Sequence, residues 1–128
     1  MTLLLDTHTV LWYWWDDPLL SATAKALITD PANVNLVSPA SPWEVAIKVS
    51  TGRLKIPGGY GGYFPHNMRR TRFTYLPTTD DHLTVVAGLP RHHGDPFDRL
   101  IVAQALAENV AVVSADAALD AYGVSRLW

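Results

Sequence analysis

Leu3-Leu4-Leu5-Asp6 places three leucines directly before an acidic residue. This run predicts a buried strand, because a short continuous apolar stretch is typical of a strand that is covered on both faces. A carboxylate at the end of such a strand is costly to bury unless something binds it. Asp6 is therefore the first candidate for a functional residue.

Predicted strands and helices alternate from this strand to the end of the chain. Short apolar runs predict strands, and runs that follow a Ser, Thr or Asp cap predict helices. The pattern is typical of an α/β fold: a doubly wound, mostly parallel sheet with helices on both faces, in one domain over residues 1–128. The strands are expected at 3–5, 34–37, 72–76, 111–113 and 124–128, and the helices at 9–15, after Ser21, Ser41, Thr79 and Asp95, and at 117–121.

Two of the predicted helices begin with the same arrangement of residues. Ser41-Pro42-Trp43-Glu44 and Asp95-Pro96-Phe97-Asp98 each place a capping side chain first, proline at the first helical position and an acid at the third. An acid there is favourable near the positive end of the helix dipole, so capping is one explanation of Glu44 and Asp98. Asp95 is expected to be the N-cap and to bind no metal.

Two aromatic-rich stretches carry less specific expectations. Residues 53–65 contain Gly58-Gly59 and Gly61-Gly62 around Tyr60 and are predicted to form a mobile surface loop. The aromatic run at 12–15 is expected in the core or at a dimer interface rather than at an RNA-binding surface. The helix after Asp95 should be buried over much of its surface, through Leu100, Ile101, Ala103, Leu106 and Ala107.

The composition restricts the class of protein. With 128 residues, 48% of them hydrophobic and 17% charged, the chain is long enough for one core and too apolar for intrinsic disorder. The lack of cysteine excludes a disulfide scaffold, a thiolate zinc site and a thiol nucleophile. The net charge of −2 argues against a wholly basic nucleic-acid-coating protein. No apolar run is long enough to span a membrane and residues 1–5 show no signal peptide, so a cytoplasmic location is expected.

Three acids follow the ends of predicted strands. Asp6 follows the first strand, Glu44 lies beyond the strand at 34–37, and Asp116 lies beyond the strand at 111–113. Because ligands bind outside the carboxyl ends of parallel strands, we expect these acids to converge at one edge of the sheet. Asp98 belongs to the first turn of a helix, which can begin at either edge.

Four carboxylates in one cleft repel one another and require a raised pKa or a counter-cation. The three lysines, Lys25, Lys48 and Lys55, are not expected to neutralise them. Clustered oxygen ligands without cysteine suit Mg²⁺, with Mn²⁺ as the alternative. The residues therefore favour a divalent metal site.

Four segments, spread over nearly the whole chain, are similar to those of one known family. They are Leu4-Leu5-Asp6-Thr7-His8, then Ser41-Pro42-Trp43-Glu44-Val45-Ala46-Ile47-Lys48, then residues 93–105 beginning His93-Gly94-Asp95-Pro96-Phe97-Asp98, and finally Val113-Ser114-Ala115-Asp116. In this order they resemble the segments of PIN-domain ribonucleases, and most closely the VapC-like toxins of type II toxin–antitoxin modules.

The resemblance implies a PIN-like fold and a Mg²⁺-dependent endoribonuclease that hydrolyses RNA phosphodiester bonds with a metal-activated water. It also implies an RNA substrate, a cognate antitoxin protein that binds in or beside the cleft, and frequent homodimers. The family's small hydroxyl residue near its fourth acid matches Ser114, which we expect on the substrate side. The family's catalytic and metal-binding acids match Asp6, Glu44, Asp98 and Asp116.

RNA binding also requires cationic contacts to phosphates. Arg69, Arg70 and Arg72 form the densest basic cluster in the sequence, and Lys48 belongs to a second cluster over residues 48–55. We expect these four side chains to flank the acidic cleft and to hold the RNA backbone.

Two other functions fit the same residues. A non-catalytic PIN-like module would act only through a protein partner and would bind neither Mg²⁺ nor Mn²⁺. A metal-independent ribonuclease would use His92 and His93 with a lysine and would survive EDTA, although adjacent histidines point in different directions on any regular element.

Overall fold

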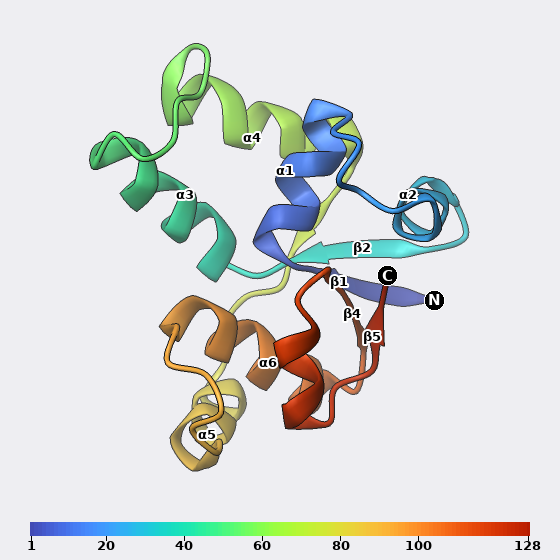
Figure 1. Cartoon of the computed structure of the whole chain (residues 1–128), viewed down its shortest axis with the longest axis vertical. Coiled ribbons are helices and arrows are strands. Elements are labelled where there is room, and N and C mark those ends of the chain that lie inside the picture. The colour runs from blue at the N-terminus through green and yellow to red at the C-terminus, as the bar shows by residue number, and fades with distance from the viewer.

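The computed structural model describes residues 1–128 as a five-stranded sheet between two layers of helices (Figure 1). The strands lie in the order β3-β2-β1-β4-β5, and every neighbouring pair is parallel, so the sheet is entirely rather than mostly parallel. The elements in chain order are β1 (Thr2–Leu5), α1 (Thr7–Trp15), α2 (Ala22–Thr29), β2 (Val34–Val37), α3 (Ala40–Ser50), α4 (Gly59–Thr71), β3 (Thr74–Tyr75), α5 (Asp80–Gly88), α6 (Pro96–Glu108), β4 (Ala111–Val113), the 3₁₀ helix η1 (Ala117–Tyr122) and β5 (Arg126–Leu127).

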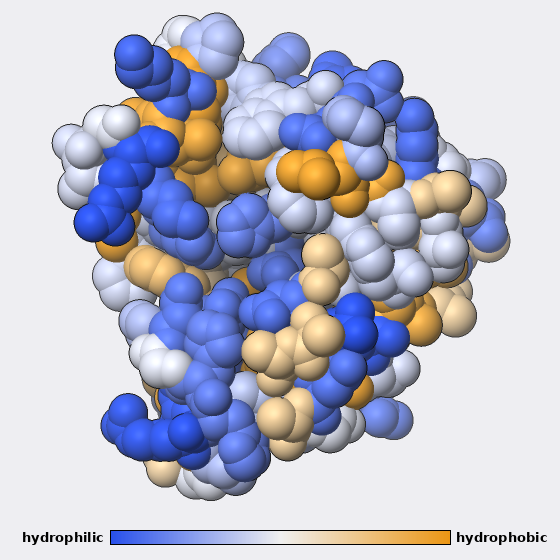
Figure 2. Space-filling model, in the orientation of Figure 1, coloured by the Kyte–Doolittle hydropathy of each residue, from blue (hydrophilic) through white to orange (hydrophobic).

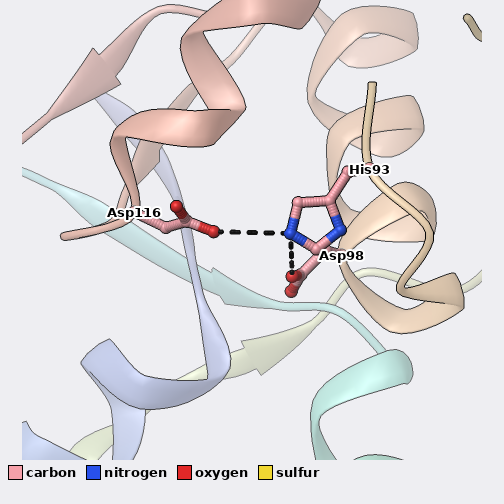
Figure 3. Close-up of side chains that lie close together, drawn as sticks. All are labelled: His93, Asp98 and Asp116. Carbon is pink, nitrogen blue, oxygen red and sulfur yellow. Dashed lines mark ion pairs between the residues drawn. The ribbon is translucent and has the colours of Figure 1, made fainter. Parts of the chain in front are cut away.

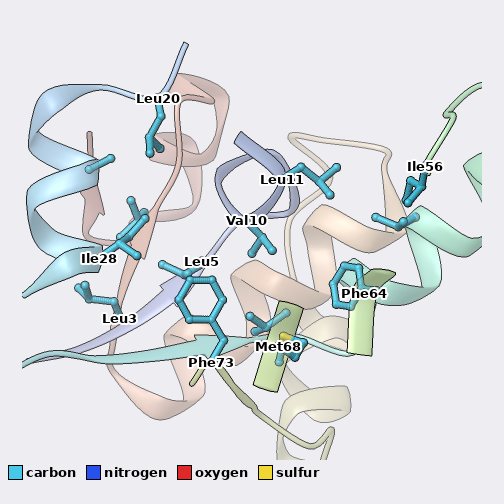
Figure 4. Packing of buried hydrophobic residues seen from close by; sticks show 14 residues of the cluster. Leu3, Leu5, Val10, Leu11, Leu20, Ile28, Ile56, Phe64, Met68 and Phe73 are labelled. Atoms are coloured by element: carbon cyan, nitrogen blue, oxygen red, sulfur yellow. The ribbon is translucent and has the colours of Figure 1, made fainter. Parts of the chain in front are cut away.

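The three leucines form the central strand, β1, as predicted. All three are completely buried, and the strand pairs with β2 on one side and β4 on the other. Leu3 and Leu5 point into one core while Leu4 points into the other, because successive side chains of a strand alternate between its faces. Figure 4 shows the first of these cores, where Leu3 and Leu5 lie among residues of α1, α2 and α4.

The two layers of helices follow from the path of the chain. From β1 the chain moves outward to β2 and β3, with α1, α2 and α4 over one face of the sheet. It then returns across the other face through α6, on which α5 packs, and adds β4 and β5 on the far side of β1. The direction of winding therefore reverses between β1 and β4, which is where an open parallel sheet offers a crevice for ligands.

Residues 59–71 form the helix α4, and the prediction of a mobile loop over 53–65 is wrong for this part. Its four glycine and proline positions give the segment a low intrinsic helix propensity, and Pro65 cannot donate the main-chain hydrogen bond of a helix interior. However, Phe64 and Met68, one turn apart, are both buried in the first core. Burial of this face outweighs the poor local propensity.

Helix α3 begins at Ala40, earlier than the predicted start after Ser41. The Ser38 hydroxyl accepts a hydrogen bond from the Ala40 N–H at 3.1 Å, while the Ser41 hydroxyl is buried and shares a hydrogen bond with Thr7 at 2.9 Å. The proline of this segment misled the prediction, because the whole first turn of a helix, not only its first residue, tolerates a missing N–H. Glu44 therefore lies beyond the first turn, and capping does not explain it.

The remaining elements match their predictions with shifts of boundary. Ser21, Thr79 and Asp95 cap α2, α5 and α6 as expected. Strands β3 and β5 are shorter than predicted, with two residues each. Leu106 and Ala107, predicted to be buried, are exposed in the last turn of α6, which borders an open hollow at the amino-terminal edge of the sheet. No helix combines the length and apolar character that crossing a membrane requires.

The variant Phe64→Ala tests the packing of α4. Because the ring is completely buried, its removal leaves a cavity, and we expect the free energy of unfolding to fall by about 3–5 kcal/mol. Leu83→Ala, at an exposed position of α5, is the control and should change this free energy by less than about 1 kcal/mol. Urea denaturation followed by circular dichroism measures both. If Phe64→Ala changed the free energy of unfolding as little as Leu83→Ala does, the packing of α4 against the core would be contradicted.

Candidate metal centre

Three acids from separate segments meet at the carboxyl-terminal edge of the sheet. Asp6 follows β1, Asp116 follows β4, and Asp98 lies in the first turn of α6; together with His8 and Trp12 they line a pocket of about 260 Å³. Figure 2 shows the surface hollowed and mainly hydrophilic in the middle of the view, where α1, α6 and η1 approach one another in Figure 1. The structure thus brings Asp98 to the same edge as the acids that follow strands.

Asp6 is held firmly within this pocket. It is only 4% exposed, and both of its carboxylate oxygens accept hydrogen bonds at 2.7 Å, Oδ1 from the Thr7 N–H and Oδ2 from the Ser114 hydroxyl. Burial raises the pKa of Asp6, while the bonds from Ser114 and Thr7 act in the opposite direction. Each oxygen keeps a further lone pair with which it could bind a cation.

Ser114 connects two of the acids. Its hydroxyl donates to Asp6 and accepts from the Asp116 N–H at 3.0 Å, and its side chain is completely buried. The expectation that Ser114 contacts the substrate does not fit this burial, because a hydroxyl without exposed surface cannot reach RNA. Its place in the structure is instead that of a residue that orients Asp6 and the turn that carries Asp116.

His93 lies beside Asp98 and Asp116, although from the sequence it was a candidate only for the metal-independent alternative. Its Nε2 lies 3.3 Å from Asp98 Oδ2 and 3.7 Å from Asp116 Oδ2 (Figure 3). The Nδ1 of the same ring accepts a hydrogen bond from the Asp95 N–H at 3.1 Å. Because this bond engages Nδ1, Nε2 is the ring nitrogen that faces the two carboxylates. His93 therefore belongs to the same cluster as Asp98 and Asp116, whose ligand atoms together could hold a metal ion.

Asp98 shows the electrostatic cost of this arrangement. Its pKa is raised to about 7, first by burial and then by the negative charges of Asp6, Asp95, Glu44 and Asp116. Carboxylates crowded in this way are relieved by a cation. Three carboxylates that face one pocket are also the oxygen ligands that a hard divalent cation prefers, so the residues present fit such a metal.

Glu44 lies beside this pocket rather than in it. It lines a neighbouring hollow with Lys48, Arg53 and Asp95, and its Oε2 forms an ion pair with the Lys48 ammonium at 2.7 Å. The expectation that no lysine neutralises the acids is therefore wrong for Glu44, since Lys48 follows it one turn later on α3. The structure places Lys48 and Arg53 next to the acidic site.

Arg69, Arg70 and Arg72 lie away from the acids, and the prediction that they flank the acidic cleft is wrong. They end α4, which leads into the amino end of β3, and Arg72 borders a hollow with Asn33 and Thr74 at the amino ends of β2 and β3. A helix that connects two parallel strands must run back across the sheet. The cluster therefore lies at the edge opposite the acids.

Arg99 is a buried cation that holds the chain around His93. Its guanidinium donates to four main-chain carbonyls, among them that of Pro90 at 2.8 Å and that of His93 at 3.5 Å. The Tyr122 hydroxyl donates to the same His93 carbonyl at 3.3 Å, and the His92 ring packs on the Tyr122 ring with centroids 5.1 Å apart. The two histidines therefore point to different neighbours and form no acid–base pair.

The fold and this cluster of acids define the class of protein. The family model of the PIN domain matches residues 3–124, so the chain belongs to the PIN-domain family, as the resemblance of its motifs predicted. Ribonuclease VapC16 of Mycobacterium tuberculosis is 38% identical over 69 residues, which cover 51% of this chain and 48% of that protein. The match therefore spans about half the length of this relative.

Solved structures share the fold over almost the whole chain. VapBC2 from Rickettsia felis, bound to a DNA fragment from its promoter, matches with a TM-score of 0.73 at 15% identity and covers 99% of this chain and 98% of its own. VapBC-1 from nontypeable Haemophilus influenzae matches with a TM-score of 0.66 at 15% identity, covering 99% and 97%. FitAcB from Neisseria gonorrhoeae matches with a TM-score of 0.62 at 16% identity, covering 98% and 96%. At these identities the likeness shows the fold alone.

In the presence of EDTA, the stability of the protein should fall as the pH rises from about 5 to about 7.5. The pKa of Asp98 is about 7 in the folded protein and lies near 4 in an unfolded chain, so across this range the folded state keeps a proton that the unfolded state has lost. Asp98→Asn removes this titration and should raise the melting temperature near neutral pH by several degrees.

Thermal unfolding at both pH values measures this effect, with the exposed Asp81→Asn on α5 as the control. The control should follow the pH dependence of the unaltered protein. An Asp98→Asn variant that loses stability with rising pH as steeply as the unaltered protein would show that Asp98 is not the strained group.

Proposed function

We propose that the protein is a divalent-metal-dependent endoribonuclease that hydrolyses RNA phosphodiester bonds, and that it is the toxin of a toxin–antitoxin module. The observation that supports this most is the crowding of Asp6, Asp98 and Asp116 in one pocket, with the pKa of Asp98 raised to about 7. Membership of the PIN-domain family and similarity to half of a VapC ribonuclease support the reaction class and the biological role.

Asp6, Asp98 and Asp116 are the residues that would hold the metal, with Mg²⁺ or Mn²⁺ as the ion that suits carboxylate oxygens. When bound, the metal supplies Lewis-acid chemistry, which stabilises negative charge on a phosphodiester and makes water a better nucleophile at neutral pH. Glu44 lies beside these acids, close enough for its charge to raise the pKa of both Asp6 and Asp98. It adds negative charge at the rim of the site, where Lys48 holds it in place.

The chain's other residues orient these acids and bind the substrate. Ser114 and the Thr7 N–H fix the Asp6 carboxylate, and Asp95 caps α6, so the Asp98 carboxylate is not needed as the cap. Lys48 and Arg53, which border the hollow next to the acids, would contact RNA phosphates on that side of the cleaved bond.

Asp6→Asn is the direct test of this function. Replacing one carboxylate oxygen by an amide removes both a negative charge and a metal-binding atom, and we expect RNA cleavage to fall by about a hundredfold or more while the fold survives. Cleavage of a pool of single-stranded oligoribonucleotides with Mg²⁺ or Mn²⁺ measures the activity. Thermal unfolding checks the fold, and Asp81→Asn, on the exposed surface of α5, is the matched control.

Chelation separates this function from the alternatives. EDTA should stop cleavage, and added Mg²⁺ or Mn²⁺ should restore it. Cleavage that persists with EDTA would favour a metal-independent ribonuclease. A protein that binds neither ion in calorimetry and cleaves no RNA would be a non-catalytic binding module.

Expression of the chain alone should arrest bacterial growth, because an uninhibited endoribonuclease depletes cellular RNA. The Asp6→Asn variant should not arrest growth at the same protein level. Co-expression of a small protein encoded beside this gene should relieve the arrest if that protein is the antitoxin. Separately, analytical ultracentrifugation of the purified protein tests for the homodimer that we expect. Equal arrest by both variants would contradict a toxicity that depends on RNA cleavage.

A further inference from the structure

An aromatic surface borders the metal centre on one side. His8 and Trp12 lie one turn apart on α1 and line the same pocket as the three acids. Their ring centroids are 5.6 Å apart with the ring planes inclined by 40°, and the Trp12 ring also packs near Trp128 with centroids 5.9 Å apart. The pocket therefore combines carboxylates with two aromatic side chains.

We propose that His8 and Trp12 form a subsite on which an unpaired nucleobase next to the cleaved bond stacks. The inference rests on the proposed nuclease function and adds to it the position and the chemical nature of a specificity determinant. Trp12 is the main residue of this subsite, and the exposed His8 ring extends it.

A nucleotide matches both parts of this pocket. Its phosphate suits a metal held by the acids, and its base suits an aromatic face, because bases stack on Trp and His rings in proteins that bind single strands. A base within a duplex is already stacked on both sides and paired. It would have to leave the duplex before it could lie against Trp12, and this costs free energy that an unpaired base does not require.

Trp12 and Trp14 are both partly buried against the first core, but only Trp12 lines the acidic pocket. The Trp14 ring packs edge-on against the buried Phe64 with centroids 4.8 Å apart, and its indole N–H donates to the Thr71 hydroxyl at 3.3 Å. Trp12 instead has part of its surface in the acidic pocket. Part of the aromatic run at 12–15 is therefore available to a substrate.

Removal of single bases tests the subsite. The cleaved bond is first mapped on a single-stranded oligoribonucleotide, and the nucleotide on each side is then replaced in turn by an abasic ribose. For one of the two positions, loss of the base should raise KM for the unaltered protein by about tenfold to a hundredfold. Trp12→Leu should raise KM for the intact strand by a similar factor. For this variant, KM should be the same for the intact and the abasic strand.

Matched variants separate stacking from folding. Trp15→Leu removes the same side chain from the same helix at a position that is 40% exposed and outside the pocket, and it should leave KM unchanged. Trp12→Phe keeps an aromatic face and should restore most of the binding. KM values are compared only between variants whose melting temperatures are equal, or after the enzyme concentration has been corrected for the folded fraction.

Binding without cleavage gives an independent readout. In the background of Asp6→Asn, a strand that carries 2-aminopurine at the identified position should lose fluorescence when it binds, because the base stacks on Trp12. The additional change Trp12→Leu should abolish this loss, and the same strand annealed to its complement should bind at least about tenfold more weakly.

The outcomes distinguish the two proposals. If the unaltered protein cleaves no RNA with either metal, the proposed function fails, whatever happens at Trp12. If it cleaves RNA but Trp12→Leu treats intact and abasic strands as the unaltered protein does, the subsite is overturned and the function stands. If Trp12→Leu weakens only the binding of an antitoxin protein, the aromatic surface belongs to that partner and not to the substrate.

Discussion

Repulsion between carboxylates at one edge of the sheet is the constraint on which the rest of this structure depends. Asp6, Asp98 and Asp116 arrive from three segments, and burial, followed by the charges of the neighbouring acids, raises the pKa of Asp98 to about 7. The sheet imposes this proximity, because β1 and β4 are neighbours and the winding of the chain reverses between them. Stability is lost locally in exchange for a site that a cation can occupy, as is common at functional sites.

The protein balances only part of this charge with its own cations. Lys48 pairs with Glu44 beside the pocket, and the Nε2 of His93 lies between Asp98 and Asp116. Asp6, the most buried of the acids, is fixed by two hydrogen bonds of 2.7 Å rather than by an ion pair. The positive charge of Lys48 thus lies beside the pocket, while no lysine or arginine forms an ion pair with Asp6, Asp98 or Asp116. Arg99, whose guanidinium donates to the His93 carbonyl, holds the loop that carries His93.

What could be predicted from the sequence depended on local interactions. The strand before Asp6 and the cap of α6 are encoded within a few residues, and both were predicted correctly. The helical state of 59–71 depends on the distant core that receives Phe64, and the position of His93 depends on a loop held by Arg99; neither is visible in a local pattern. The position of the basic cluster at 69–72 was predictable from the sequence. A helix that precedes a parallel strand ends at the amino edge of the sheet, away from the acids at the carboxyl edge.

One helix sets the position of both the central carboxylate and the aromatic surface. Asp6 is the N-cap of α1, and Trp12 follows six residues later, about 9 Å along the helix axis at 1.5 Å per residue. Both residues line the same pocket, so this one helix sets their separation. The Thr9 hydroxyl, which donates to the Val113 carbonyl at 2.7 Å, fixes the first turn of this helix to β4. The spacing between the acids and the ring is therefore fixed by the helix and the sheet rather than by a mobile loop. A base stacked on a ring that is held in this way can keep its phosphate at a fixed distance from the metal site.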